Sequence, residues 1–408
     1  MREPLFTPAD ILLPKGDFEN WSVIACDQFT SRPDYWAEAA ELTKGKPSTL
    51  SLIYPEVYLE KTDPVKTVEK INSKMNEYLG SGVYDEYKNA FVYVERTQSD
   101  GKVRSGIVGK VDLDRYDYRE GAKAEIRATE KTVVERIPPR VEIRKNASCE
   151  LPHVLMLMDD KDETVMGELY LNKDSFTKLY DFPLMLGGGH LCGWLVPESY
   201  NEKISSAVDA LGNGNEMRLA VGDGNHSLAS AKACHDQYPD RIDRFALVEL
   251  VNIHSDALEF EPIYRTVENV NASALQKAFE DFITENGASL NGGSQRITLV
   301  YGNEKTEYNV KNPPHSLAVG TVQLFLDKVK GNFKDMAVDY IHGEDEVLTI
   351  AKKPNACGFL YGGIGKSELF PAVEKDGTLP RKTFSMGTAR DKRYYTEVRK
   401  ILSKAPQQ

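Results

Sequence analysis

The clearest periodic pattern in the chain lies between Asp63 and Gly80. Asp63 is a residue type that caps helix N-termini, Pro64 suits the first helical position, and Gly80 suits a helix end. Between them, apolar residues recur at spacings of three and four, which places them on one helical face. These residues are Val65, Val68, Ile71, Met75 and Leu79. The pattern predicts an amphipathic helix over residues 64–80.

Short apolar runs bounded by polar turns predict strands in the first two thirds of the chain. Ala90–Arg96 and Gly106–Leu113 are predicted to be neighbouring strands, because the segment between them contains the turn-like Gln98-Ser99-Asp100-Gly101. Further strands are predicted at His153–Met158, Arg218–Gly222 and Phe245–Ile253. The residues Ser227–Cys234 are small and compatible with a helix directly after the second of these runs.

The last third of the chain alternates between strand and helix patterns. Asn271 is a good N-cap for a helix with Leu275, Phe279, Phe282 and Ile283 on one face. The alternation continues through Ile297–Tyr301, Val338–Ile341, Glu344–Ala351 and Cys357–Tyr361. Such alternation favours βαβ-like packing.

These patterns predict a mixed α/β (α+β) fold with more than one packed unit. Domains usually contain about 100–200 residues, so a chain of 408 residues suggests two or three units. Changes of pattern along the chain place the predicted regions at 1–124, 125–268 and 269–408.

Composition excludes several classes of protein. The net charge of −11 disfavours non-specific binding to nucleic acid, which depends on Lys and Arg neutralising phosphates, and disfavours acidic membrane surfaces. No window approaches 18 consecutive apolar residues, and the N-terminus lacks the apolar run of a signal peptide. The five cysteines are scattered and form no C-x-x-C pair. We therefore expect a cytoplasmic protein with no disulfide framework and no membrane association.

The sharpest candidate site is a predicted strand end, turn and helix start with the sequence Val221-Gly222-Asp223-Gly224-Asn225-His226-Ser227. A helix N-terminus presents free N–H groups and the positive end of the helix dipole, which suits a phosphate. Gly224 lets the backbone approach a ligand, and Asp223 can hold a metal ion or orient a hydroxyl. His226 can act as acid or base near neutral pH, and Ser227 can add a hydroxyl contact. The alternative is a plain turn in which Asn225 or Ser227 only caps the helix.

Three further segments carry weaker signals. Asp27 follows an apolar run, a position where α/β proteins place ligands, but it could equally cap a helix ahead of Pro33. Gly362–Ser367 ends like a P-loop, yet Leu360 stands where the first glycine is required, which favours a tight connection. The basic and aromatic run Arg390–Arg399 predicts an amphipathic terminal helix with a solvated basic face.

Several motifs, taken in order, resemble those of a known family. The Asp223 turn resembles a D-G-H-H-R motif. The other matching segments are Ala25-Cys26-Asp27, Ala128-Thr129-Glu130-Lys131-Thr132, Pro262-Ile263-Tyr264-Arg265 and Leu379-Pro380-Arg381-Lys382-Thr383-Phe384. In this order and spacing the chain resembles the bacterial and archaeal family called domain of unknown function 1015, over nearly its full length.

The resemblance has implications for function. The D-G-H-H-R element is similar to the nucleotide-binding helix start of the ParB/sulfiredoxin-like superfamily, which includes free-serine kinases. It implies a ParB/sulfiredoxin-like module at residues 125–268 that binds ADP, ATP or CTP with Mg²⁺. By the same resemblance, Asp223 is the metal ligand, the backbone at Gly224, Asn225 and His226 binds phosphate, and Glu130 is the catalytic base. Asp223 and His226 are the other expected catalytic residues.

The chain departs from the family motifs at three positions. Asn225 stands in place of the first His, and Thr129 in place of the His before Glu130. Ser227 stands in place of the Arg, so a strong phosphate donor is lost. The missing charge could come from Arg136, Arg265 or Lys382. The expected substrate contacts are Asp27, Tyr264 and Lys382.

Three functions are weighed on these grounds. The leading expectation is phosphoryl transfer from a nucleotide to a small hydroxyl-bearing metabolite, which depends mainly on positioning and electrostatics. The second is a nucleotide or metabolite sensor, or a ParB-like regulator without turnover, which the Ser227 departure favours. The third and weakest is a DNA-binding regulator, which would need a helix-turn-helix and a basic face. The sequence leaves the choice between enzyme and sensor, and the oligomeric state, open.

Overall fold

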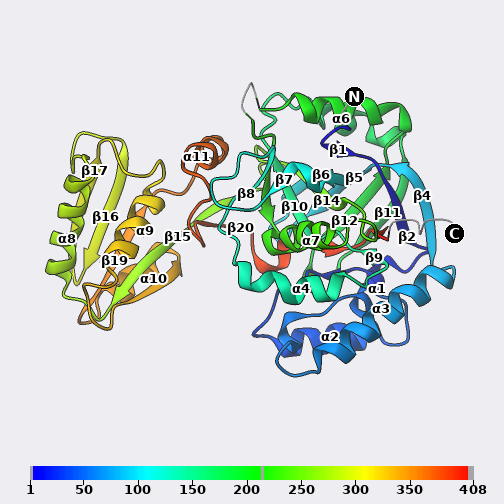
Figure 1. Cartoon of the computed structure of the whole chain (residues 1–408), viewed down its shortest axis with the longest axis horizontal. Helices are drawn as coiled ribbons and strands as arrows, with labels where there is room; N and C mark the ends of the chain where they lie inside the picture. Colours follow the sequence, from blue (N-terminus) through cyan, green and yellow to red (C-terminus); the bar gives the residue numbers. More distant parts are fainter. Residues whose placement is uncertain (1–2, 213–215, 403–408) are drawn as a thin grey trace. The chain divides into compact units, whose positions relative to one another are not determined.

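The computed structural model describes residues 3–212 and 216–402, and it divides into two compact units. The large unit contains Met1–Ala128, Thr132–Leu258 and Gly387–Gln408, and the small unit contains Thr129–Lys131 and Glu259–Met386 (Figure 1). The sequence predicted three consecutive regions. In the structure, the chain instead leaves the large unit twice and returns to it each time.

A ten-stranded mixed sheet forms the centre of the large unit. Its strands follow the order β11-β12-β5-β6-β14-β10-β13-β8-β7, and β1 pairs with β6. The pairs β10-β14, β13-β8 and β7-β8 are parallel, and the other neighbours are antiparallel. The strands are β1 Phe6–Thr7, β5 Val92–Thr97, β6 Val103–Asp112, β7 Tyr116–Asp117, β8 Ile126–Ala128, β10 Val154–Met158, β11 Thr177–Pro183, β12 His190–Leu195, β13 Leu219–Asp223 and β14 Phe245–Asn252.

The described part of the large unit also contains three two-stranded sheets and seven α-helices, besides short 3-10 turns. The small sheets pair β2 Ala9–Pro14 with β4 Tyr84–Ala90, β3 Val23–Ile24 with β21 Tyr394–Tyr395, and β9 Cys149–Glu150 with β22 Arg399–Lys400. The helices are α1 Phe18–Trp21, α2 Pro33–Leu42, α3 Pro64–Gly80, α4 Ile137–Arg144, α5 Gly167–Asn172, α6 Asn201–Ala210 and α7 Asn225–Gln237.

The large sheet is buried on both faces. In β5, Tyr93 packs in one apolar cluster while its neighbours Val92 and Val94 pack in another, because successive side chains of a strand point to opposite faces. The first cluster includes residues of α6 and α7, and the second includes residues of α2. In Figure 1, α6 and α2 accordingly lie on opposite sides of the sheet. The sheet is thus a rigid layer that can position side chains at its strand ends.

The helix predicted at residues 64–80 is confirmed as α3, Pro64–Gly80. The Asp63 side chain accepts hydrogen bonds from the backbone N–H groups of Val65 and Lys66, as expected of an N-cap. The buried face carries Ile71, Met75 and Tyr78. Val65 is 67% exposed, so the apolar face begins after the first turn.

The small unit contains a six-stranded sheet in the order β17-β16-β19-β15-β18, with β20 also paired to β15. The helix predicted after Asn271 is confirmed as α8, and the Asn271 side chain accepts a hydrogen bond from the Ala274 N–H. The elements are β15 Phe260–Glu268, α8 Ala272–Glu285, β16 Gln295–Tyr301, β17 Glu304–Val310, α9 Ala318–Val329, β18 Ala337–His342, α10 Glu344–Ala351, β19 Ala356–Tyr361, α11 Leu369–Asp376 and β20 Phe384–Met386.

The predicted βαβ-like alternation of the small unit takes a split form. β18 and β19 both run antiparallel to β15, so they are parallel to each other with β15 between them. Helix α10 connects them across that intervening strand. The predicted alternation of elements is therefore confirmed, while each strand pair in the described sheet is antiparallel.

The prediction of a terminal helix at Arg390–Arg399 is wrong. The segment is largely extended and contributes β21 and the first residue of β22 to two small sheets of the large unit. Two of its cations, Arg393 and Arg399, are buried where a solvated basic face was expected. These residues are 2% and 3% exposed. Each guanidinium meets buried carboxylates from distant parts of the chain, which a reading of local charge pattern does not reveal.

The described residues contain no helix that is both long enough and apolar enough to cross a membrane. The mixed α/β class predicted from the sequence is confirmed by both units.

Candidate functional site

The strand, turn and helix predicted around Asp223 are present in the large unit. Strand β13 ends at Asp223, and α7 begins at Asn225. Gly224 between them has φ +85°, a left-handed conformation that favours glycine. A Cβ at Gly224 would also lie 2.9 Å from His153 Cδ2 and 3.1 Å from Val154 Cα. The turn therefore needs glycine both for its backbone angle and for its close approach to the start of β10.

His153, directly before β10, connects this turn to two other segments. Its Nδ1 lies 2.6 Å from the Tyr395 hydroxyl, and its Nε2 lies 3.5 Å from Asp27 Oδ2. The Cys26 N–H donates to the same hydroxyl at 3.2 Å. The imidazole is 11% exposed and the Asp27 side chain 33%. A mostly buried histidine thus holds an accessible carboxylate.

Asp27 and His153 favour each other's charged forms. Burial disfavours the Asp27 carboxylate, but His153, the Gln28 side-chain amide and the Lys392 charge outweigh it and hold the pKa of Asp27 well below its ordinary value. Burial likewise opposes the imidazolium, but Tyr395 and Asp27 raise the pKa of His153 well above its ordinary value. At neutral pH the pair is an ion pair, so Asp27 is a hydrogen-bond acceptor and a poor proton donor.

A second ion pair lies in the same region. Lys392 Nζ is 3.3 Å from Asp223 Oδ2, and the two side chains are 16% and 20% exposed. Because the Lys392 charge also lowers the pKa of Asp27, one cation acts on both carboxylates. We call Asp27, His153, Asp223, Lys392 and Tyr395 the strand-end cluster. Its members come from four separate parts of the chain, and the C-terminal segment supplies two of them.

Helix α7 starts two residues after Asp223, a member of this cluster. His226 Nε2 accepts a hydrogen bond from the Val133 N–H at 3.2 Å, which assigns the proton of the neutral ring to Nδ1. Ser230 Oγ donates to the His226 carbonyl at 2.6 Å. The Asn225 Oδ1 atom is buried and has no hydrogen-bond partner among the described residues. Asn225, His226 and Ser227 are all half-buried.

Glu130, the predicted base, belongs to the small unit. Its Oε1 accepts a hydrogen bond from the Thr383 N–H at 3.3 Å. Residues on either side take part in the same connection, because Glu130 forms a parallel bridge with Leu379, whose N–H donates to the Thr129 carbonyl at 2.7 Å. Glu130 is thereby fixed against the segment that the sequence singled out as a family element.

Arg265 supports that same segment from inside the small unit. It is fully buried, and its guanidinium donates to the Arg381 and Lys382 carbonyls at 2.9 and 2.8 Å. Lys382 Nζ lies 5.2 Å from the centre of the Tyr340 ring, and Tyr264 packs on Tyr361 with ring centres 5.5 Å apart. In this structure the donors of Arg265 face protein oxygens, so the residue shapes the loop that carries Lys382.

The sequence-predicted site residues therefore form two groups. The group in the large unit is Asp27, Asp223, Gly224, Asn225, His226 and Ser227, and the group in the small unit is Glu130, Tyr264, Arg265 and Lys382. The side chain of Arg136 lies outside the described part of the chain.

Sequence reasoning missed His153, Lys392 and Tyr395. One available signal was a histidine placed directly before a buried apolar strand. The other was the tyrosine pair Tyr394-Tyr395, since aromatic residues favour strands over helices.

The glycine-rich Gly362–Ser367 segment is a tight connection, as expected. The Gly365 N–H donates to Glu368 Oε2 at 2.7 Å. A carboxylate of the protein itself thus occupies the position that an anion would take at this turn.

Comparison with solved structures gives distant likenesses. A free serine kinase variant in complex with AMP has 11% identity and a TM-score of 0.39, covering 70% of this chain and 90% of that chain. A conserved hypothetical protein from Pyrococcus furiosus has 10% identity and a TM-score of 0.34, covering 68% and 89%. SbnI with C-terminal truncation from Staphylococcus aureus has 12% identity and a TM-score of 0.35, covering 69% and 82%. These values are too low to support an argument about fold or function.

No curated protein matches the chain. A family model matches residues 7–329, which include the Asp223 turn, Asp27 and His153, whereas Lys392 and Tyr395 lie beyond the matched residues. The chain belongs to the family described as Protein of unknown function (DUF1015).

Proposed function

We propose that this protein is a nucleotide-binding phosphotransferase that acts on a small hydroxyl-bearing metabolite. The observation that carries the proposal is the turn at Gly224, where a helix N-terminus starts beside an aspartate paired with a lysine. In this proposal the strand, turn and helix belong to a ParB/sulfiredoxin-like nucleotide module, as the family motif suggests.

The start of α7 is suited to phosphate on three grounds. The helix is thirteen residues long, so its N-terminal N–H groups and dipole can attract an anion. Lys392 beside Asp223 supplies the positive charge that Ser227 does not, and it does so in the large unit itself. The buried Asn225 Oδ1, with no described partner, can accept a hydrogen bond from a ligand hydroxyl or amino group.

The strand-end cluster also suits a divalent cation. Mg²⁺ is usually held by one or two carboxylates together with waters and substrate phosphates. Asp223 is our proposed ligand, and Asp27 is a second carboxylate within reach of the Lys392 charge. When bound, Mg²⁺ would neutralise charge on the phosphate oxygens. Lys392 would then pair with phosphate instead of Asp223.

The proposed transfer forms one bond to phosphorus and breaks another. The substrate hydroxyl oxygen forms a bond to the terminal phosphorus of the nucleotide, and the bond from that phosphorus to its bridging oxygen breaks. The hydroxyl proton passes to solvent. The family resemblance alone suggests Glu130, which belongs to the small unit, as a base. Asp27, held ionised by His153, accepts a hydrogen bond from a substrate hydroxyl. Tyr264 and Lys382, in the small unit, are substrate contacts suggested by the family resemblance alone.

Isothermal titration of the full chain with ATP, ADP and CTP, each with and without Mg²⁺, tests the proposal. AMP completes the series of adenine nucleotides. We expect at least one nucleotide to bind more tightly with Mg²⁺ than without. No binding at millimolar nucleotide in the presence of Mg²⁺ would refute the proposal.

A sensor without turnover is the second candidate, and two observations favour it. Ser227 replaces the Arg of the family motif, and His226 Nε2 is already engaged by the Val133 N–H. Incubating the protein with a bound nucleotide and a mixture of hydroxyl-bearing metabolites separates the two functions. A phosphorylated metabolite, detected by mass spectrometry, supports the enzyme, and nucleotide binding without any such product supports the sensor.

A further inference from the structure

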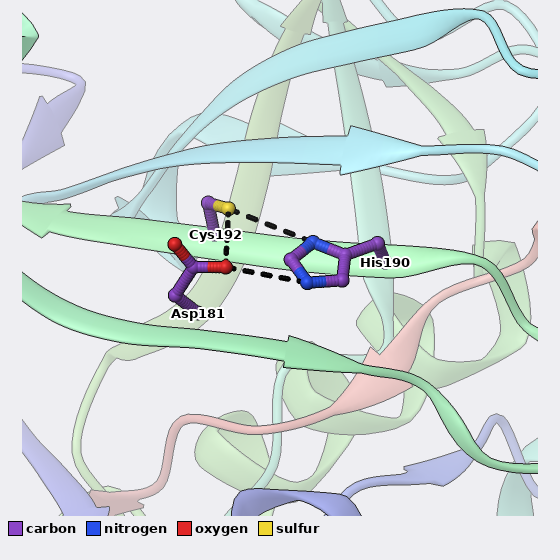
Figure 2. A group of neighbouring side chains, drawn as sticks. All are labelled: Asp181, His190 and Cys192. Atoms are coloured by element: carbon purple, nitrogen blue, oxygen red, sulfur yellow. Dashed lines mark hydrogen bonds and ion pairs between the residues drawn. The ribbon is translucent and has the colours of Figure 1, made fainter.

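A cluster of three possible metal ligands lies on the hairpin β11–β12, at one edge of the large sheet. Asp181 in β11 and Cys192 in β12 are direct cross-strand partners. His190 precedes Cys192 by two residues in β12, so the two side chains lie on the same face. Figure 2 shows Asp181, His190 and Cys192 converging on that face.

The donor atoms lie close to the spacing found around a tetrahedral zinc ion. Asp181 Oδ1 lies 3.2 Å from His190 Nε2 and 3.3 Å from Cys192 Sγ, and Cys192 Sγ lies 3.6 Å from His190 Nδ1. Zinc bonds of about 2.0–2.3 Å at tetrahedral angles place neighbouring donors roughly 3.3–3.6 Å apart. The two contacts of His190 use different ring nitrogens, so the imidazole must turn for one nitrogen to serve as the third donor. One donor atom from each side chain already lies within 4.8 Å of the other two.

The cluster is open to solvent on its exposed side. Lys178 Nζ pairs with Asp181 Oδ2 at 2.6 Å, which leaves Oδ1, the oxygen facing His190 and Cys192, as the ligand atom. The side chains of Asp181 and His190 are 41% and 40% exposed, so an ion can enter from solvent. The same exposure admits a water molecule as a fourth ligand.

We propose that Asp181, His190 and Cys192 form a Zn²⁺ site with three protein ligands and one water. Binding converts the Cys192 thiol to a thiolate and releases its proton to solvent. A site with one thiolate, one imidazole and one carboxylate suits zinc better than Mg²⁺ or Ca²⁺, which prefer oxygen ligands alone.

This site is separate from the strand-end cluster. Strand β12 is four positions from β10 in the sheet, which corresponds to about 19 Å at the usual strand spacing. The zinc site can therefore be confirmed or refuted independently of nucleotide binding. Because β11 pairs only with β12 in the sheet order, a bound ion would join an edge strand to its neighbour and stabilise the hairpin.

Titration of chelator-treated full chain with ZnCl₂, followed by a metal-sensitive chromophoric competitor, tests the proposal. We expect one equivalent of zinc in the wild type and at least a tenfold loss of affinity in Asp181→Asn, His190→Gln and Cys192→Ser. His342→Gln is the matched control, since His342 is exposed in the small unit, and it should bind zinc as the wild type does.

Two outcomes of the zinc titration would overturn the site. One is no zinc binding by the wild type. The other is binding that depends on Cys192 but survives both Asp181→Asn and His190→Gln, which would mean adventitious capture by a thiol. Cobalt substitution of the wild type adds a test that needs no variant, because thiolate ligation gives a sulfur-to-metal charge-transfer band. A cobalt complex without that band would also contradict the proposal.

Discussion

Two neighbouring residues of the C-terminal segment show how differently this protein uses the same kind of charge. Arg393 enters a buried ion network with Glu249 and Glu397, and all three are at most 2% exposed. Lys392, one residue earlier, pairs with Asp223 in the strand-end cluster, where both side chains reach solvent. The segment thus uses one residue to anchor itself in the large unit and the adjacent one to present a cation at the candidate site.

The difference in burial between these two pairs indicates which charges are available to a ligand. A buried charge whose partner is removed leaves an uncompensated ion, so its partners are fixed by the fold. A pair at a strand end with partial exposure can exchange one partner for another at small cost. By this criterion the buried network determines stability, and the strand-end cluster is the place to look for binding.

The largest expected effect is on stability, from Arg393→Met. The substitution leaves Glu249 and Glu397 buried without their main cation, and loss of one partner of a buried pair costs about 3–5 kcal/mol. The midpoint of urea unfolding of the full chain measures the change in stability. Arg32→Met is the control, because the pair of Arg32 with Asp34 is exposed, and it should leave the midpoint unchanged. Equal effects of the two substitutions would contradict the distinction between the two regions.

The next effect comes from Gly224→Ala. Alanine at a left-handed angle costs about 1–3 kcal/mol, and the contacts with His153 and Val154 add about 1–3 kcal/mol of overpacking. Gly101→Ala separates the two causes, because Gly101 also has φ +85° and a Cβ there would meet nothing within 4 Å. Thermal unfolding should therefore show Gly224→Ala as clearly the less stable variant. If the two variants unfold at the same temperature, the close contacts of Gly224 with His153 and Val154 do not affect stability.

The ion pair of Asp27 and His153 predicts a pH dependence within the strand-end cluster. The raised pKa of His153 contributes stability that is complete below its ordinary value of 6.5 and is lost as pH rises through the raised pKa. The lowered pKa of Asp27 contributes stability that is complete above its ordinary value of 3.8 and is lost as pH falls through the lowered pKa. The pair is therefore most stabilising between about pH 4 and 6.5.

Unfolding of wild type and His153→Gln from about pH 4 to pH 9 checks this prediction. The difference in free energy of unfolding should be largest up to about pH 6.5 and should shrink as pH rises from there toward the raised pKa of His153. His342→Gln, at an exposed position, should show no such trend. A difference that does not change between pH 6 and 9 would show that His153 is not charged in the folded protein.

The smallest expected effect on stability is that of Lys392→Gln. The pair of Lys392 with Asp223 is more exposed than the network around Arg393, so the midpoint of urea unfolding should move less than in Arg393→Met. Circular dichroism should be unchanged. A loss of stability as large as that of Arg393→Met would mean that Lys392 belongs to the buried network and not to a binding site.

Local signals in the sequence predicted much of the fold. The caps at Asp63 and Asn271 and the turn at Gly224 are visible in a few consecutive residues, because capping and left-handed turns depend on near neighbours. The C-terminal segment was mispredicted because Arg393 finds Glu249 more than 140 residues away. For the same reason the candidate site was half predicted: Asp27, Asp223 and Gly224 carry local signals, whereas Lys392 joins them only through the fold.

We propose that Lys392 and the start of α7 bind the phosphates of a nucleotide. One calorimetric comparison measures the contribution of Lys392. The full chain, Lys392→Gln and Lys400→Gln are titrated with ATP and Mg²⁺ under the same conditions. Lys400 is the matched control because it lies in the same segment and pairs with Glu86 at an exposed position. We expect binding to wild type and Lys400→Gln, and an affinity at least about tenfold weaker in Lys392→Gln, as expected for a lost charge-assisted contact. Equal affinity in all three proteins, or no binding to any of them, would contradict it.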